Sequence, residues 1–297
     1  MPLGKTRPLL ALFLAAVDPV RSLGLDQLPP QTRSVFLNIG SNLEPLVPPA
    51  DNDTVITVAF EPIVHARIAP HPRIYVVPAA VAASEGLAMM AVLNKDSVSS
   101  SLAAPTDALE AAMRDRNQDA TTHKMVPVLS MKEVLHSIPS RLAVWLLKTD
   151  MQGFDFVALH SAGHQLRKAQ YVITEVYIRG SKSYNMSGGN DYCRDWLPFM
   201  TSIGYEPMAL AHGSHNFRSA KDAAAYCAAE HSPTLLKRFP SAELDAFWKL
   251  KGTPLPAPPT REWTAPATLV DELTTAPPTT TRQSHGHAPP KPWSSFG

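Results

Sequence analysis

Polar residues stand at the carboxyl ends of two apolar segments, where their types suit the binding of a nucleotide-like ligand. Residues 38–42 (NIGSN) follow the first segment, and Gly40 there would let a ligand approach the backbone closely. Glu61 ends the second segment, 61 − 40 = 21 residues later. This spacing is close to the interval of about 20 residues between a dinucleotide-type loop and its ribose-binding carboxylate. The pair indicates a ligand site, although an ordinary tight turn and an exposed strand end would give the same residues.

A third group of polar residues follows a later apolar segment. Lys148, Asp150 and Gly153 come where residues 142–147 (LAVWLL) would emerge from a buried strand. A charged pair at the exit of such a strand is costly unless it is solvated or partnered. A site explains these residues better than the core does, and a Lys/Asp pair that merely caps the strand is the alternative.

Short apolar strands alternate with helical patterns along the chain, and this alternation predicts an α/β fold. Continuous apolar runs suit strands that are covered on both faces, as in a mostly parallel sheet with helices on both faces. Gly153 precedes one helical pattern, and Gly204 is expected to end another. The predicted strands are residues 35–39, 55–60, 74–77, 142–147, 171–177 and the extended stretch 205–210.

The overall composition limits the class of protein. The chain has 297 residues, 44% of them apolar, so it can bury a full-sized core. Lys and Arg total 27 against 26 Asp and Glu, which leaves no broad positive field for nucleic acid. The only two cysteines, Cys193 and Cys227, can form a single disulfide or remain two buried thiols.

Both ends of the chain differ from its middle. Residues 1–24 have a basic start and an apolar run at 9–17, which predicts a cleaved signal peptide and the secretory pathway (Golgi lumen or outside the cell). Import into an organelle is the alternative. The run is too short to span a bilayer, so no stable membrane span is expected. Residues 251–297 are rich in proline and threonine and predict a disordered tail.

The order of four motifs resembles the FkbM methyltransferase family. They are FLNIGSN (36–42), VAFEP (58–62), LLKTDMQGFDFVALHSAG (146–163) and ITEVY (173–177). The resemblance implies a three-layer, Rossmann-like class I fold with a seven-stranded sheet and S-adenosylmethionine as methyl donor. It also implies methylation of a hydroxyl group on a glycan or another small molecule. We expect this domain at residues 31–215, followed by a helical extension at 216–250.

The resemblance also implies roles for individual residues. Asp150 and Lys148 are the expected catalytic residues, with Asp150 near the transferred methyl group and able to take the acceptor proton. His160 and His164 have a metal-compatible spacing but no matching third ligand, so no metal site is predicted. The expected cofactor-binding residues are Asn38, Gly40, Ser41, Asn42, Glu61 and Pro62, of which Glu61 would bind the ribose and residues 40–42 the amino-acid part of the donor.

Two other functions stay open, and two departures from the family pattern bear on the first of them. Residues 44–49 (EPLVPP) break any long helix after the first loop, and Gln152 stands where many members carry Glu. A catalytically inactive secreted binding protein is favoured if the proline-rich stretch closes the donor pocket. An NAD-dependent oxidoreductase would suit the spacing of Gly40 and Glu61, but the second and third glycines of a pyrophosphate turn are missing.

Overall fold

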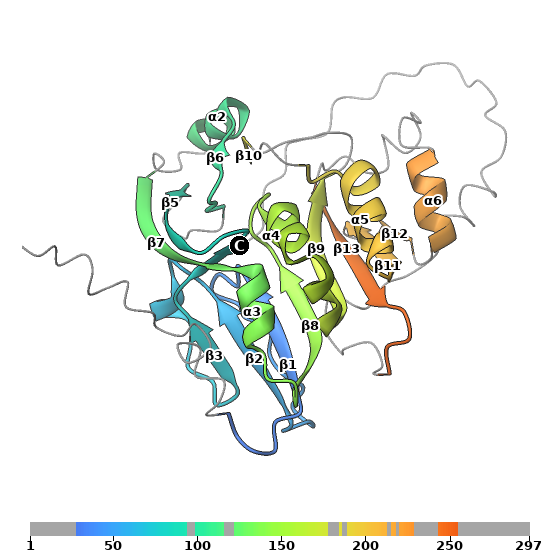
Figure 1. Cartoon of the computed structure of the whole chain (residues 1–297). Helices are drawn as coiled ribbons and strands as arrows, with labels where there is room; N and C mark the ends of the chain where they lie inside the picture. The colour runs from blue at the N-terminus through green and yellow to red at the C-terminus, as the bar shows by residue number, and fades with distance from the viewer. Residues whose placement is uncertain are drawn as a thin grey trace, which may run out of the picture.

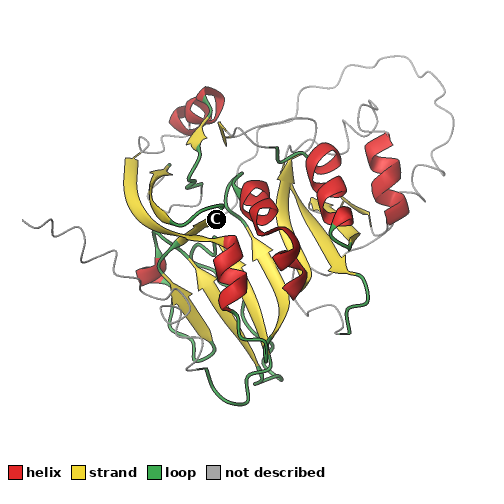
Figure 2. Cartoon of the chain, viewed as in Figure 1, coloured by secondary structure: helices red, strands yellow, loops and turns green. Residues whose placement is uncertain are grey.

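The structure is a mixed α/β fold built around one large sheet (Figures 1 and 2). This computed structural model describes residues 28–93, 99–115, 122–177, 184–185, 189–212, 215–217, 220–228 and 243–254. The signal peptide predicted at residues 1–24 and nearly all of the tail predicted at 251–297 lie outside these residues. Within the described ranges, no helix combines the length and the apolar character needed to cross a membrane.

The large sheet is mixed, and its main part is parallel. Its strands are β1 (Ser34–Ile39), β2 (Val55–Phe60), β3 (Ile74–Val77), β8 (Ala143–Thr149), β9 (Ala169–Tyr177), β11 (Tyr205–His212), β12 (His215–Phe217) and β13 (Glu243–Leu250). They lie in the order β12-β11-β13-β9-β8-β1-β2-β3. The five strands from β3 to β9 are parallel, whereas β13 is antiparallel to both of its neighbours. The predicted parallel sheet is thus confirmed in its main part, with eight strands instead of seven.

The parallel register brings the predicted site residues to one edge of the sheet. Ile39 at the end of β1 pairs with Phe60 of β2 and with Thr149 of β8. The residue that follows each of these strand ends is therefore Gly40, Glu61 or Asp150, and the three lie side by side. This geometry follows from strands of similar length, each of which ends next to a glycine or a carboxylate.

The segment predicted as a helical extension at residues 216–250 is instead partly a strand. β13 lies between β9 and β11, where it pairs with Val172 and its neighbours on one side and with Tyr205–Ala211 on the other. Leu244, Ala246 and Trp248 are buried on one face of the strand and Phe247 on the other. This burial on both faces explains why the segment belongs inside the sheet.

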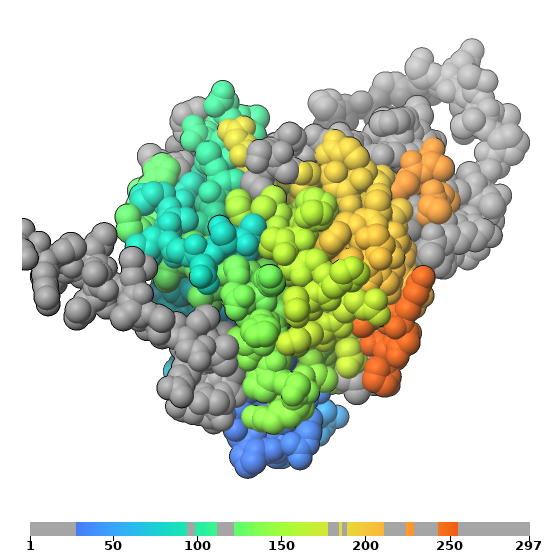
Figure 3. Space-filling model, in the orientation of Figure 1, coloured from blue at the N-terminus to red at the C-terminus, as the bar shows by residue number. Residues whose placement is uncertain are grey.

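The described α-helices that pack on the sheet cover one of its faces, so the expected three-layer arrangement is only partly seen. They are α3 (Met131–Ser137), α4 (Asp155–Ala162), α5 (Leu197–Ser202) and α6 (Ala220–Ala228), all in front of the strands in Figure 1. Figure 3 shows the molecule from this side, and each of the four helices contributes buried side chains to one apolar core shared with the sheet. On the other face, Phe36, Trp145, Tyr171 and Phe247 form a second cluster, to which no described α-helix contributes.

The proline-rich stretch after β1 packs onto that second face. Leu46 is buried in the cluster, its amide donates to Asn38 Oδ1 at 2.8 Å, and its carbonyl accepts from Thr57 Oγ1 at 2.7 Å. Proline disfavours a helix here, and these two buried hydrogen bonds satisfy the backbone instead.

Local signals in the sequence explain the ends of the helices. Ser130 caps α3 by accepting from the amide of Glu133 at 3.1 Å. α4 ends at Gly163 with φ +52°. Gly204, with φ +94°, follows the end of α5 as expected.

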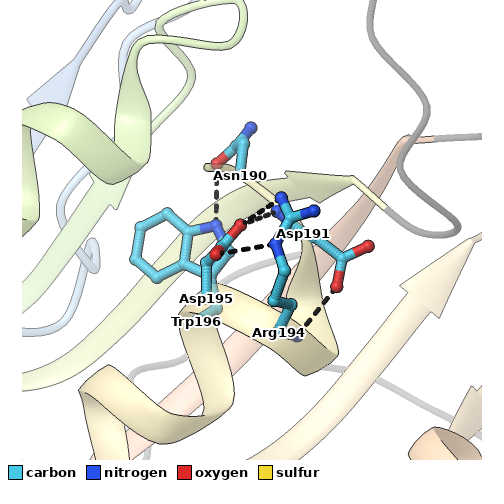
Figure 4. A network of polar contacts seen from close by, with 5 residues as sticks. All are labelled: Asn190, Asp191, Arg194, Asp195 and Trp196. Carbon is cyan, nitrogen blue, oxygen red and sulfur yellow. Dashed lines mark hydrogen bonds and ion pairs between the residues drawn. The ribbon is translucent and has the colours of Figure 1, made fainter. Parts of the chain in front are cut away.

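A network of polar contacts precedes α5 and fixes the turn η5 (Tyr192–Trp196) (Figure 4). Asp191 accepts from the amide of Arg194 at 2.8 Å, and Asp195 accepts from the amide of Asp191 at 3.0 Å. Trp196 Nε1 donates to Asn190 Oδ1 at 2.7 Å. The reciprocal bonds satisfy backbone donors at the start of the turn.

A disulfide joins Cys193 of η5 to Cys227 of α6. The two cysteines are 34 positions apart in the sequence, and their bond links two neighbouring elements of the helical face.

Smaller elements lie above the carboxyl edge of the sheet. A three-stranded sheet in the order β4-β7-β5 and a two-stranded pair β10-β6 stand there, together with helix α2. Their bounds are β4 (Ala80–Ala82), β5 (Gly86–Val92), β6 (Ala104–Pro105), β7 (Thr122–Ser130), β10 (Tyr184–Asn185) and α2 (Asp107–Asp115), with the 3-10 turns η3 (His65–Arg67) and η4 (Gly163–Lys168) elsewhere.

Candidate functional site

A pocket of about 130 Å³ opens at the carboxyl edge of the parallel strands. Its floor comes from the ends of β1, β2 and β8, and β4 and β5 supply one wall. Most of the lining is apolar, with a few polar groups, as is usual for small-molecule sites. It is lined by Ile39, Gly40, Asn42, Phe60, Glu61, Pro62, Ala79, Ala80, Val81, Met90, Ser100, Leu102, Asp150, Met151, Gln152 and Phe154.

Gly40 turns the chain between β1 and the pocket. Its φ is +70°, a conformation that glycine adopts without strain. A Cβ atom at this position would overlap the main-chain oxygen of Asp150. Glycine is therefore required by the close approach of the two strand ends, whether or not a ligand is bound.

Glu61 ties the first loop to the end of β2. Its Oε2 accepts from the amide of Asn42 at 2.9 Å, and its Oε1 accepts from the amides of Ile63 at 2.8 Å and Val64 at 3.1 Å. An ionised carboxylate has about four acceptor positions, and three are used here. One acceptor position on Oε2 is left for a ligand in the pocket.

Asp150 lies in the pocket beside Gln152. The Gln152 Nε2 donates to Asp150 Oδ1 at 2.8 Å, and the Asp150 amide donates to the carbonyl of Ile39 at 3.0 Å. The main chain of Asp150 is therefore fixed by β1, and its carboxylate is fixed by the neighbouring amide.

Two buried polar atoms of the pocket residues have no hydrogen-bond partner among the residues that the structure describes. They are Asn42 Oδ1 and Ser100 Oγ. Leaving such atoms unsatisfied costs roughly 1–3 kcal/mol each, so native proteins rarely do so without a reason. Both atoms are suited to hydrogen bonds with a polar ligand.

Three of the predicted site residues do not line the pocket. Asn38 and Lys148 pair with each other in the sheet, and Asn38 is buried with its Oδ1 bonded to Leu46. Side chains of a strand alternate between the two faces of the sheet, and those of Asn38 and Lys148 lie on the face away from the helices. Asn38 therefore holds the proline-rich stretch in place through its bond with Leu46. Ser41 is buried, and its Oγ contacts the carbonyl of Asn42 at 3.5 Å. Gly40, Asn42, Glu61, Pro62 and Asp150 do line the pocket.

The charges around Asp150 are mostly negative. Burial, followed by the charge of Asp150, raises the pKa of Asp155 from 3.8 to about 7. Burial and then Asp150 also raise the pKa of Glu175 well above its usual range, with smaller contributions from Glu243 and Asp245. The Oε2 of Glu175 is buried without a hydrogen-bond partner in the described part of the chain. Both carboxyl groups therefore hold their protons more strongly than exposed carboxyl groups do.

The histidine pair considered for a metal has another environment. The His160 ring packs between Phe156 and Phe199, with ring centroids 5.3 and 4.9 Å away. Over the described ranges, no group of three or more His, Cys, Asp or Glu side chains has the arrangement of a metal site.

The upper wall of the pocket has no recognisable pattern in the sequence. Ser100 carries no chemistry that its neighbours in the chain would indicate, and Met90, Leu102 and Phe154 are ordinary apolar residues until the fold brings them together. Gln152 does have a signal, because it departs from the pattern of the resembling family. Its contacts with Asp150 depend on the tertiary structure.

A comparison with protein families shows to which family the chain belongs. The methyltransferase FkbM domain matches residues 35–207, which is more than half of the chain. The chain belongs to the FkbM methyltransferase family. The matched region of this FkbM protein starts in β1 and ends within β11, so it contains every residue of the pocket but not β13. Neither a curated protein nor a solved structure matches the chain significantly.

Proposed function

We propose that the protein transfers a methyl group from S-adenosylmethionine to a hydroxyl oxygen of a glycan or another small hydroxylated acceptor. The observation that supports this most is the pocket that brings together the Gly40 turn, Glu61 and Asp150. A site in the secretory pathway remains part of the proposal and depends on the signal peptide predicted from the sequence.

The residues of the pocket fit the chemical groups of the donor. The apolar lining suits the adenine ring, and the remaining acceptor position on Glu61 Oε2 suits one ribose hydroxyl. Asn42 Oδ1 is buried and unsatisfied among the described residues, so it suits a donor such as an ammonium or hydroxyl group. Only one ribose hydroxyl can bind Glu61 directly in this arrangement, because the backbone already uses the other three positions.

The donor, when bound, supplies a methyl group on a positively charged sulfur that is a good leaving group. The protein then has to align the acceptor oxygen with the methyl carbon and exclude water. As the new C–O bond forms and the S–C bond breaks, the hydroxyl proton moves to a base. Asp150 is the proposed base, because it is the carboxylate of the pocket that has an oxygen with no donor among the described residues.

The inactive binding protein is favoured only if the proline-rich stretch closes the pocket. No residue of the stretch 44–49 lines the pocket, and Leu46 packs on the opposite face of the sheet. The structure thus gives no support to that alternative.

Calorimetric titration with S-adenosylhomocysteine tests the proposal. We expect saturable binding by the full chain at micromolar concentration and no binding of NAD under the same conditions. Binding of NAD alone would favour an oxidoreductase, and absence of binding by both compounds would rule out the proposed donor site.

A further inference from the structure

Gln152 holds a strained backbone conformation in the wall of the pocket. Its φ is +53°, in the left-handed region that residues other than glycine, asparagine and aspartate rarely adopt. Gly153 follows with φ +89°. Strain of this kind persists where the surroundings determine it, and it concentrates at functional sites. A glycine at position 152 would avoid the strain, so the side chain needs its own explanation.

Contacts from three parts of the chain hold Gln152 in place. Its Nε2 lies 2.8 Å from Asp150 Oδ1, and its Oε1 lies 3.0 Å from the hydroxyl of Tyr184 in β10. Its main-chain carbonyl accepts from Ser101 Oγ at 3.0 Å. The amide is therefore bound at both of its ends and cannot rotate freely.

The direction of the amide follows from its two neighbours. Burial, with smaller contributions from Glu243, Glu175 and Asp150, raises the pKa of Tyr184 far above its usual range, so its hydroxyl keeps its proton. The single proton of this hydroxyl is shared between two acceptors, Gln152 Oε1 at 3.0 Å and the carbonyl of Ser99 at 2.9 Å. The Asp150 Oδ1 accepts at 2.8 Å, so the donating Nε2 is the end of the amide that lies there.

We propose that Gln152 is a positioning residue that fixes the carboxylate of Asp150 through a hydrogen bond to its Oδ1. The amide occupies Oδ1, and no described residue donates to Oδ2, which is left to the pocket. The role of Asp150 as a proton acceptor rests on the proposed function, whereas its hydrogen bond with Gln152 does not.

A neutral residue matters at this position because Asp150 has acidic neighbours on several elements. Asp155 in α4 and Glu175 in β9 both interact with its charge, and Tyr184 faces it from β10. Lys148 precedes it on β8. A carboxylate at position 152 would stand as close to Asp150 as the amide does now, and two carboxylates so close do not ionise independently.

Carbon-13 NMR of the full chain, without any ligand, tests the inference through the titration of Asp150. The aspartates carry the label at the side-chain carboxyl carbon, and Asp150→Asn identifies the signal. In Gln152→Gly the carboxylate loses its donor, so we expect Asp150 to take up its proton at a higher pH than in the wild type. In Gln152→Glu, Asp150 and the new carboxylate titrate as a pair. The last proton of this pair should leave at a pH about one unit or more above that of the Asp150 titration in the wild type, a larger change than in the glycine variant.

Gln31→Glu is the matched control, because Gln31 is exposed and precedes the amino end of β1, at the opposite edge of the sheet. It should leave the Asp150 titration unchanged. The same Asp150 titration in Gln152→Glu and in the wild type would overturn the inference. The glycine variant provides a second test if the glutamate variant does not fold, since an unchanged titration there contradicts the inference too. Failure of S-adenosylhomocysteine to bind would instead contradict the proposed function alone.

Discussion

At the scale of single residues, the pocket depends on groups that serve both folding and binding. Gly40 permits two strand ends to meet, and Glu61 fixes the loop that carries Asn42. Asp150 differs from them, because its carboxylate accepts a hydrogen bond from the side chain of Gln152 and from no other described residue. Substitutions should therefore separate structural from chemical roles.

Asp150→Asn should lower methyl transfer by about 10²-fold or more, since the asparagine amide cannot accept the proton of the acceptor. Its affinity for S-adenosylhomocysteine should change little. Transfer from radiolabelled S-adenosylmethionine into a panel of glycans and small alcohols measures the first effect, and calorimetry measures the second. Equal transfer by both proteins would remove Asp150 from the mechanism.

Gly40→Ala should destabilise the fold by about 3 kcal/mol, because it combines an unfavourable positive φ with a clash against the Asp150 carbonyl. Gly252→Ala is the control. Gly252 has φ +77° but open space around its missing Cβ, so it should cost only about 1 kcal/mol. Urea unfolding measures both, and equal losses would show that the contact with Asp150 is unimportant.

Asp155 makes stability depend on pH. Its pKa is about 7 in the fold against 3.8 ordinarily, so between these values the unfolded chain releases a proton that the fold retains. The free energy of unfolding should therefore fall as pH rises from about 4 to 7, and this contribution is lost above pH 7. The size is on the order of 4 kcal/mol.

Asp155→Asn should remove this slope, because asparagine stays neutral at every pH. The variant should gain stability relative to the wild type as pH rises, as measured by urea unfolding at several pH values. Asp51→Asn, at an exposed position, is the control, and its free energy of unfolding should depend on pH as that of the wild type does. If the free energies of unfolding of Asp155→Asn and the wild type differ by the same amount at every pH, the raised pKa of Asp155 is contradicted.

At the scale of elements, the disulfide is the main covalent constraint on the helical face. Cys193 and Cys227 are 34 positions apart in the sequence, so their bond closes a loop of that length. Replacing both with serine should lower the free energy of unfolding by about 3–4 kcal/mol, mainly through the gain in freedom of the unfolded chain. Donor binding should persist, because neither η5 nor α6 lines the pocket. Denaturant unfolding of the wild type with and without reductant is the parallel measurement, and equal stabilities would contradict the bridge.

The parallel half of the fold is easier to predict from the sequence than the rest. β1, β2, β3, β8 and β9 are visible there because continuous apolar runs indicate burial on both faces. β13 falls in a segment predicted as helical, because its place inside the sheet depends on distant neighbours. The same limit applies to the site. Gly40, Glu61 and Asp150 follow strand ends and could be predicted, whereas Ser100 and the hydrogen bonds of Gln152 depend on the three-dimensional fold.

At the scale of the whole molecule, the sheet needs residues far beyond the family match. β13 supplies hydrogen bonds to β9 on one side and β11 on the other. A chain that ends at residue 212 should therefore fail to unfold cooperatively, although it contains the matched domain. A chain that ends at residue 254 should keep a cooperative transition in circular dichroism, since the sequence predicts a disordered tail beyond it. A cooperative transition in the shorter chain would show that β13 is dispensable.

The central place of β13 also has a consequence for biosynthesis. While the ribosome is still adding residues 213–242, β9 and β11 have been made, but the strand that joins them has not. The nascent chain must keep two long unpaired edges apart from each other and from other chains until residue 250 has emerged. Slow translation of this stretch should therefore expose the protein to aggregation more than an equal delay elsewhere.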